Sequence, residues 1–153
     1  MLTKNDVDIL EALQVDGRLS NVELAKKIGL SESPCLRKTK QLEENAVIKG
    51  YKAVVDPKGV GCTISAIILV NLDQRSEADG ESFYTALQDE KRVTECLAIT
   101  GSADLVLRVV AKDIEDLTEF TFNGLLRHPS VKDISSCVVL KEIKEQSPLP
   151  VFR

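Results

Sequence analysis

The sequence predicts an α+β protein of two domains, a small helical domain followed by a larger domain built around an antiparallel sheet. Apolar residues recur at helical spacing through the first third of the chain, and beyond it they alternate or run together as they do in β-strands. Between the two parts, residues 56–62 contain a proline and two glycines, which end regular structure. We therefore expect one domain over residues 1–55 and another over 63–153, with 56–62 as the linker.

Composition and charge narrow the class of protein. Residues 1–55 hold nine Lys and Arg against eight Asp and Glu, a net charge of +1. Residues 56–153 have a net charge of −5, which brings the whole chain to −4. No apolar run approaches the roughly 20 residues that span a bilayer, and the N-terminus has no apolar signal region. We expect a cytoplasmic protein with no membrane partner.

Cysteine spacing argues against a metal or disulfide framework. The four cysteines are Cys35, Cys62, Cys96 and Cys137, which lie far apart and form no CxxC pair. Neither a zinc site nor a set of disulfides is therefore indicated, and we interpret all four as buried free thiols.

The first domain is expected to contain three helices. Thr3 or Asn5 stands before the first, and Ser20 with Glu23 has the spacing of a capping box at the start of the second. Gly29 ends the second helix, because glycine adopts the left-handed conformation at little cost. A short turn then leads into a third helix that carries Pro34 in its first turn, where no N–H partner is needed. Two helices joined by a tight turn of this kind form a helix-turn-helix.

The third helix has two different sides when its residues are placed 100° apart. The side expected to be buried carries Cys35, Thr39, Leu42 and Ala46. The opposite side carries Ser33, Arg37, Lys40 and Glu44, with Gln41 at its flank. Such a surface suits the DNA major groove, where Arg and Lys can contact guanine edges or phosphates and Gln can pair with adenine. A solvated helix face is the alternative for a bare run of charges, and the preceding glycine turn favours DNA.

Residues 47–55 form a short segment rich in β-branched residues, and we expect it to leave this domain as an extended arm. With the arm, the domain would be winged-helix-like. The arm would bring Lys49 and Lys52 near phosphates. Lys38 falls near the buried flank of the third helix, so we assign it to a phosphate at best. The candidate DNA-binding residues are Ser31, Ser33, Arg37, Lys38, Lys40, Gln41 and Lys49.

The second domain has the predicted order βαββαβ. The expected elements are a strand over 63–72 covered on both sides, a helix over 80–87 with Phe83, Tyr84 and Leu87 inward, strands over 93–100 and 104–111 joined by a turn at 101–103, a helix from Asp113 to Leu126 ended by His128 and Pro129, and a long strand over 131–143. This order is the ferredoxin-like arrangement, an antiparallel sheet with helices on one face. The other face keeps apolar side chains, and we expect a second copy of the chain to bury it.

The chain resembles the Lrp/AsnC (leucine-responsive, or feast/famine) transcription regulators. The matching stretches are DVDILEALQVDGRLSNVELAKKIGLSESPCLRKTKQLEENAVIKGY, ITGSADLVLRV and LLRHPSVKDISSCVVLKEIK, which cover nearly the whole chain. The resemblance implies an N-terminal helix-turn-helix that binds double-stranded DNA and a C-terminal amino-acid-sensing domain. It also implies dimers formed through the sheets, which assemble into octamers or similar discs.

The resemblance places the effector pocket between dimers, near a turn made of Thr100, Gly101, Ser102, Ala103 and Asp104. Chemically, glycine lets the backbone approach a ligand, turn N–H groups can hold a carboxylate, and Asp104 can accept from an α-ammonium group. The facing wall would carry Ser135, Ser136 and Cys137. On the residues alone, the alternative is that Gly101 merely makes the turn and Asp104 caps it.

An apolar amino acid such as leucine or methionine is the expected effector, since the surrounding strands offer apolar side chains and little charge to balance an ionic one.

We expect no cofactor and no catalytic residues. A metabolic enzyme on the same architecture, like the siroheme decarboxylases, would lean on histidine, and the chain has only His128. An architectural DNA-coating protein or a stand-alone amino-acid sensor is the other alternative, to which the pI of about 5.1 lends some support.

Overall fold

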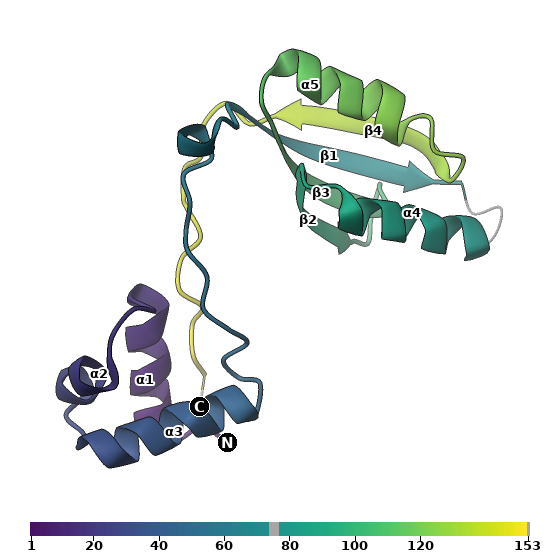
Figure 1. Cartoon of the computed structure of the whole chain (residues 1–153). Helices are drawn as coiled ribbons and strands as arrows, with labels where there is room; N and C mark the ends of the chain where they lie inside the picture. The colour runs from purple at the N-terminus through teal and green to yellow at the C-terminus, as the bar shows by residue number, and fades with distance from the viewer. Residues whose placement is uncertain (74–76, 153) are drawn as a thin grey trace. The chain divides into compact units, whose positions relative to one another are not determined.

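The structure is a computed structural model that describes residues 1–73 and 77–152 (Figure 1). The chain forms two compact units, one of Met1–Val54 together with Ile143–Arg153, and the other of Val55–Glu142. The first boundary falls within a residue of the expected end of the helical domain. The last residues differ, because the sequence pattern assigns them to the second domain and the structure places them with the helices.

The first unit contains α1 (Lys4–Val15), α2 (Asn21–Ile28) and α3 (Glu32–Glu44). Thr3 forms a capping box with Asp6 at the start of α1, and Ser20 forms the predicted one with Glu23. Gly29 ends α2 in the left-handed conformation at φ 71°. These local signals confirm the helix-turn-helix, because each depends on residues within one turn of the helix end.

The core of this unit is made by one side of each helix. Its buried members are Ile9, Leu10, Ala12, Leu24, Ala25, Cys35 and Leu42. Ala46 was expected to join them, but that prediction is wrong because α3 ends at Glu44 and Ala46 is exposed with φ 54°. Beyond α3, residues 49–56 contain no strand and run as the expected extended arm.

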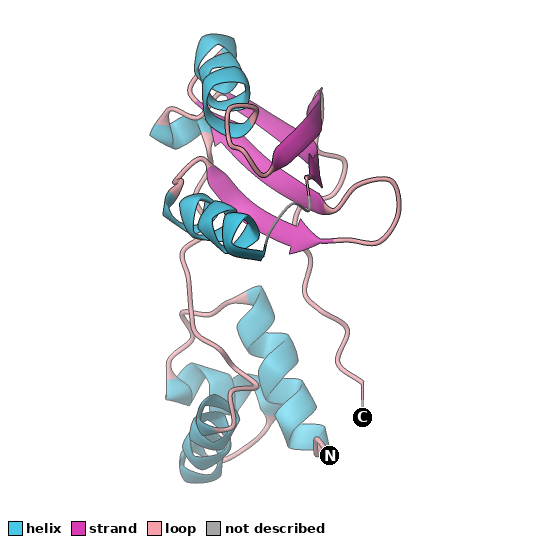
Figure 2. Ribbon diagram, turned by 90° about the vertical axis from the view of Figure 1, so that its right-hand side faces the viewer, coloured by secondary structure: helices cyan, strands magenta, loops and turns pink. Residues whose placement is uncertain are grey.

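The second unit contains β1 (Ile64–Leu72), α4 (Glu77–Asp89), β2 (Val93–Ala98), β3 (Leu105–Ala111), α5 (Ile114–Glu119) and β4 (Val131–Val138). A π-helical segment, η2 (Phe120–Leu125), continues α5. The strands form one sheet in the order β2-β3-β1-β4, and every neighbouring pair is antiparallel. The βαββαβ prediction is confirmed, with the helices on one face of the sheet (Figure 2).

The side chains of β1 show that the described residues cover one face of this sheet and leave the other partly exposed. Ala66, Ile68 and Val70 are fully buried under the helices, while the residues between them are only partly buried. Within residues 1–73 and 77–152, the expected cover on both sides of β1 is therefore not found. Tyr84 was expected to point inward, but 44% of it is exposed, whereas Phe83 and Leu87 are buried as predicted.

The last strand is shorter than predicted, ending at Val138 instead of residue 143. Its partner β1 begins at Ile64 and pairs Ala66 with Val138, so only two residues of β1 lie beyond that pair, and the last ladder bond runs from the Val139 N–H to the Ser65 carbonyl at 2.8 Å. The interpretation of all four cysteines as buried is also wrong, because Cys35 alone is fully buried and both Cys96 and Cys137 are exposed.

Candidate nucleic-acid interface and ligand-binding turn

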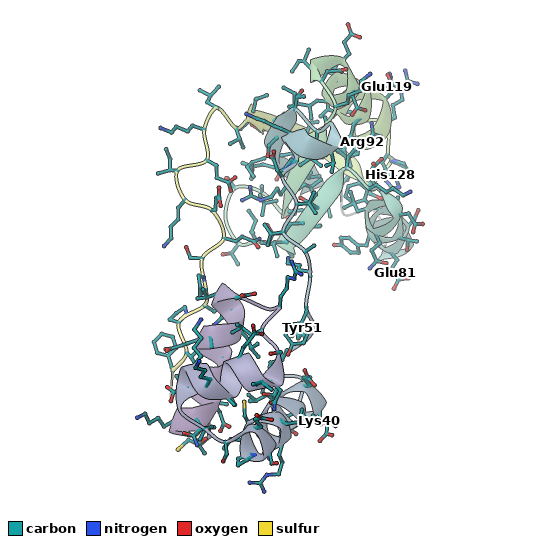
Figure 3. The ribbon with its side chains drawn as sticks, turned by 60° about the vertical axis from the view of Figure 1, so that its left-hand side comes forward. Lys40, Tyr51, Glu81, Arg92, Glu119 and His128 are labelled. Atoms are coloured by element: carbon teal, nitrogen blue, oxygen red, sulfur yellow. The ribbon has the colours of Figure 1, made fainter. Side chains whose placement is uncertain are left out.

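The polar side of α3 is a continuous exposed surface. Ser33, Arg37, Lys40 and Gln41 are all exposed, while Cys35 and Leu42 on the opposite side are buried. Ser31 stands at the N-cap of α3 and is exposed as well. Figure 3 shows Lys40 on this helix. The division of the helix predicted from 100° spacing is therefore present, and it leaves Arg, Lys, Gln and Ser side chains free to meet another molecule.

The turn before α3 fixes this surface relative to α2. The Leu30 N–H donates to the Ala25 carbonyl at 2.9 Å, which closes the end of α2. The Asn21 side-chain amide, at the start of α2, donates to the Glu32 carbonyl at 3.0 Å. The first bond shapes the start of the turn and the second joins α2 to α3, so α3 has a defined direction, which a groove-binding helix requires.

Lys38 is paired within its own unit, whereas the part of the chain that the structure describes holds no ion-pair partner for Arg37 or Lys40. Its Nζ donates to Asp6 Oδ1 at 2.8 Å and to Thr3 Oγ1 at 3.0 Å, and so ties α3 to the start of α1. The two charged side chains are only 20% and 13% exposed. Burial by itself would raise the pKa of Asp6, but the hydrogen bonds from Lys38 and Thr3 outweigh it and lower the pKa to about 2. The ammonium group of Lys38 is therefore engaged inside the unit.

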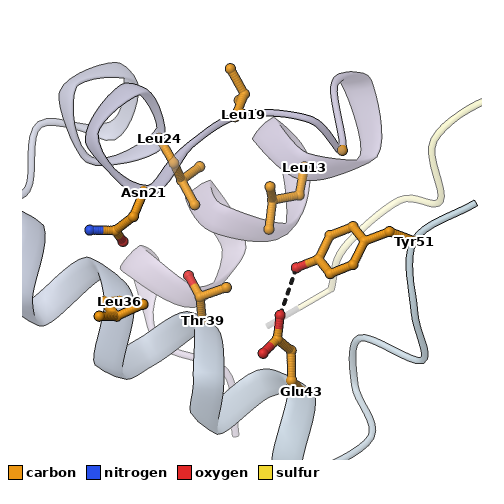
Figure 4. Close-up of a pocket in the computed structure, with 9 residues that line it drawn as sticks. Leu13, Leu19, Asn21, Leu24, Leu36, Thr39, Glu43 and Tyr51 are labelled. Atoms are coloured by element: carbon orange, nitrogen blue, oxygen red, sulfur yellow. Dashed lines mark hydrogen bonds between the residues drawn. The ribbon is translucent and has the colours of Figure 1, made fainter.

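Tyr51 attaches the extended arm to the helices (Figure 4). Its hydroxyl donates to Glu43 Oε1 on α3 at 2.9 Å, and its ring covers Gly17, where an added Cβ would lie 3.4 Å from the ring. Partial burial and the neighbouring Glu43 carboxylate raise the pKa of Tyr51 to about 12. Sequence reasoning missed this residue, although an aromatic side chain between two lysines was a usable signal. Lys49, two residues earlier in the arm, is exposed.

The Tyr51 hydroxyl also borders a hollow of about 260 Å³ in the helical unit. The hollow is lined by Leu13, Gly17, Leu19, Asn21, Leu24, Leu36, Thr39, Glu43 and Tyr51. Its polar groups already bond to one another or to backbone, as Tyr51 does to Glu43 and Thr39 does to the Cys35 carbonyl. The hollow therefore offers little to a polar ligand.

The predicted ligand-binding turn joins β2 to β3. Gly101 has φ 126°, a conformation that residues with a Cβ rarely adopt, and nothing lies within 4 Å of the position where its Cβ would be. Thr100 and Ser102 are exposed, whereas Ala103 is buried. The turn thus presents open backbone at Gly101 beside two hydroxyl groups, which is a surface that a small polar ligand could approach.

Asp104 closes the turn against β1. Its Oδ2 accepts from the Leu72 N–H at 2.8 Å, and its backbone N–H donates to the Val70 carbonyl at 3.1 Å. Its carbonyl also accepts from the Ile99 N–H at 2.9 Å. One carboxylate oxygen therefore serves the fold, as the capping alternative supposed, and only the other is left for a ligand within the described part of the chain.

The predicted facing wall lies on β4, which β1 separates from β3. Ser135 and Cys137 pair with Leu69 and Ile67 of β1, while Ser136 pairs with Ile68. Paired residues in an antiparallel ladder share a face, and Ile68 is buried beneath the helices. Ser135 and Cys137 therefore lie on the open face and Ser136 on the helical face, so the structure does not bring all three to one surface.

A second hollow, of about 280 Å³, lies between α4 and η2 over Phe83 and Phe120. The guanidinium of Arg92 stands 4.8 Å from the centre of the Phe120 ring and bonds to Glu90 and to Asp116, each at 2.8 Å. The hydrogen bond with Glu90, followed by that with Asp116, raises the pKa of Arg92 above its ordinary value. The guanidinium of Arg92, a residue labelled in Figure 3, is thus already paired with two carboxylates.

Other classes of site find little support in the residues that the structure describes. Within 1–73 and 77–152, no group of three or more His, Cys, Asp or Glu side chains is arranged to hold a metal ion. Among the same residues, no helix combines the length and the apolar character needed to cross a bilayer.

A helix-turn-helix with an exposed polar third helix, joined to a ferredoxin-like domain with an open sheet face, defines a two-domain DNA-binding regulator. Two family models match the two parts: a winged helix-turn-helix DNA-binding model over residues 2–49, and the Lrp/AsnC ligand-binding domain over residues 65–149. The chain belongs to the Lrp/AsnC family of transcription regulators.

Full-length relatives support this assignment. The chain is 36% identical to the transcriptional regulator AzlB of Bacillus subtilis, over 99% of this chain and 96% of that protein. It is 34% identical to the leucine-responsive regulatory protein of Escherichia coli K12, over 98% and 92% of the two chains. Among solved structures, the L-Met complex of the transcriptional regulator NMB0573 from Neisseria meningitidis matches with a TM-score of 0.94 and 38% identity, over 98% and 97% of the chains.

Proposed function

We propose that this regulator reads DNA with the polar side of α3 and responds to an apolar amino acid, such as leucine or methionine, at the turn between β2 and β3. The main support for DNA binding is that Ser33, Arg37, Lys40 and Gln41 are exposed on the side of α3 opposite its buried residues. Side chains of this kind on a helix held by a fixed turn can bond base edges in the major groove.

The roles of the individual residues follow from their positions. Arg37 and Gln41 lie one helical turn apart and are the base-contacting candidates, because each can form two hydrogen bonds with one base. Ser31 and Ser33, at the start of α3, and Lys40 are candidates for phosphate contacts. Lys49 is the phosphate contact of the arm. We leave Lys38 out of the interface, since its ammonium group already bonds to Asp6 and Thr3.

The proposal for the effector rests on the relatives and on the turn. One relative of similar length is named as leucine-responsive, and the matching structure of another holds L-Met. In this chain, the backbone at Gly101 and the second carboxylate oxygen of Asp104 offer groups for the α-carboxylate and the α-ammonium. The apolar side chains of Leu97 and Ile99, 49% and 38% exposed, lie on β2 and directly before the turn, where they can receive an apolar side chain.

The open face of the sheet supports assembly. The partly exposed residues Ile67 and Leu69 of β1 share this face with Val106 of β3, and a second copy of the chain would remove them from water. We propose a dimer formed through this face and an octamer or similar ring of dimers, acting on DNA in the cytoplasm without catalysis. Ser135 and Cys137 then complete the effector pocket from a neighbouring copy.

Two measurements test this function. A footprint on duplex DNA should show protected half-sites about 10 bp apart, or a multiple of that, because two readers related by a two-fold axis contact the same side of the duplex. A calorimetric screen of the amino acids with the intact assembly should show heat for leucine or methionine. Equal protection of every DNA sequence in competition would instead identify an architectural DNA-coating protein. The absence of binding heat for every amino acid in the screen would contradict the proposal of an amino-acid effector.

A further inference from the structure

The last residues of the chain lie against the DNA-binding helices, although they follow the final strand of the ligand-binding domain. Leu149 makes two hydrogen bonds with the side-chain amide of Gln14 on α1: its N–H donates to Oε1 at 2.6 Å, and its carbonyl accepts from Nε2 at 3.2 Å. Figure 1 shows the C-terminal segment returning to the helical unit. Gln14 thus binds one residue of extended backbone as a neighbouring strand would.

Val151 adds an apolar anchor to this contact. It is partly buried and packs against the core cluster that the three helices share. The side chain of Leu149, in contrast, is 75% exposed, so that residue is held by its backbone. Pro148 and Pro150 flank it and restrict the backbone to extended conformations, which lowers the entropy lost when the segment docks.

We infer that residues 147–151 form a strap that belongs to the DNA-binding unit, clamped by Gln14 and anchored by Val151. The arm is the first connection between the two units, and Tyr51 fixes it to α3 through Glu43. The strap is a second connection, reached from the end of β4 through residues 139–146. Two attached connections restrict rotation of the DNA-binding unit more than a single linker does.

Hydrogen exchange in the full-length protein tests the strap directly. The Leu149 amide should exchange more slowly than in a free peptide of the same sequence, by about fivefold for one hydrogen bond. Gln14→Ala should abolish this protection, and Glu11→Ala, an exposed change on the same helix, should leave it in place. A Leu149 amide that exchanges at the free-peptide rate in the unchanged protein would overturn the inference.

A double-mutant cycle adds a readout on α1. Gln14→Ala and truncation after Gln146 should each speed amide exchange in the last turn of α1, and the combined change should match truncation alone, because both remove the same contact. Additive effects would show that Gln14 acts on α1 without the tail and would overturn the clamp.

The strap has a consequence for DNA that rests on the proposed function. When rotation of the DNA-binding units is restricted, binding to two half-sites at once costs less entropy. Truncation after Gln146 should therefore weaken binding to a duplex with two half-sites by about fivefold and change the affinity for a single half-site by less than about twofold. An equal loss of affinity for both duplexes would contradict the idea that the strap restricts rotation of the DNA-binding units. If the protein bound no DNA, the proposed function would fail, whereas the exchange experiment would still decide the strap.

Discussion

Replacing Lys38 by Met should lower the stability of the helical unit and leave its electrostatic attraction to DNA unchanged. The change removes a charged hydrogen bond of 2.8 Å to Asp6 and a second bond of 3.0 Å to Thr3. Hydrogen bonds to charged groups contribute about 1.5–3 kcal/mol, and partial exposure of both side chains reduces this to about 1–2 kcal/mol. For a unit of this size, the midpoint of thermal unfolding falls by about 4–8 °C per kcal/mol.

Lys40→Met is the matched control, since Lys40 is exposed on the same helix and has no ion pair in the described part of the chain. It should leave the unfolding midpoint nearly unchanged. The slope of log affinity against log salt for DNA should fall by about 0.9 in the Lys40 variant and stay constant in the Lys38 variant. The reasoning is refuted if Lys38→Met shows the smaller salt slope at full stability, because Lys38 would then be a phosphate contact.

Three further changes separate structural from functional roles. Asp104→Asn keeps an oxygen for the Leu72 N–H and should lose only amino-acid binding in calorimetry, whereas Asp104→Ala should also destabilise the second unit by about 1 kcal/mol in urea. The pKa of Asp6 in the folded unit is about 2, below its ordinary 3.8, so the ionised carboxylate contributes about 1–2 kcal/mol to the free energy of unfolding above pH 4. This contribution should vanish as the pH falls toward about 2, and an Asp6→Asn variant should lack the pH-dependent loss. Lys49→Ala should weaken all duplexes alike in a salt titration, and a change of sequence preference would contradict its assignment to phosphate.

The elements that sequence analysis predicted well are those fixed by neighbouring residues. The capping box of Ser20 and Glu23 and the left-handed Gly29 each depend on groups within a few positions, so spacing suffices to find them. A continuous apolar run located β1, alternation of apolar residues located β3, and the order of elements then selected the sheet. The exposed surface of α3 followed from the helical spacing of about 100° per residue.

Contacts between distant residues could not be predicted in this way. Lys38 meets Asp6 across 32 positions and Gln14 meets Leu149 across 135, and no local pattern in the sequence links either pair. The end of β4 depends on where its partner begins, which its own apolar residues do not reveal. For the effector site, strand order was decisive, because it places β1 between the turn and the serines of β4.

Selection of bound duplexes from a random-sequence library tests the central claim most directly, namely that the exposed side of α3 reads DNA sequence. The unchanged protein should enrich a two-fold symmetric motif, and Arg37→Ala or Gln41→Ala should enrich a motif altered at matching positions in both half-sites, with an affinity cost of about 1–3 kcal/mol for each lost pair of base contacts. Enrichment of the same motif by all three proteins, or of none by the unchanged protein, would contradict the assignment of this helix surface to base recognition.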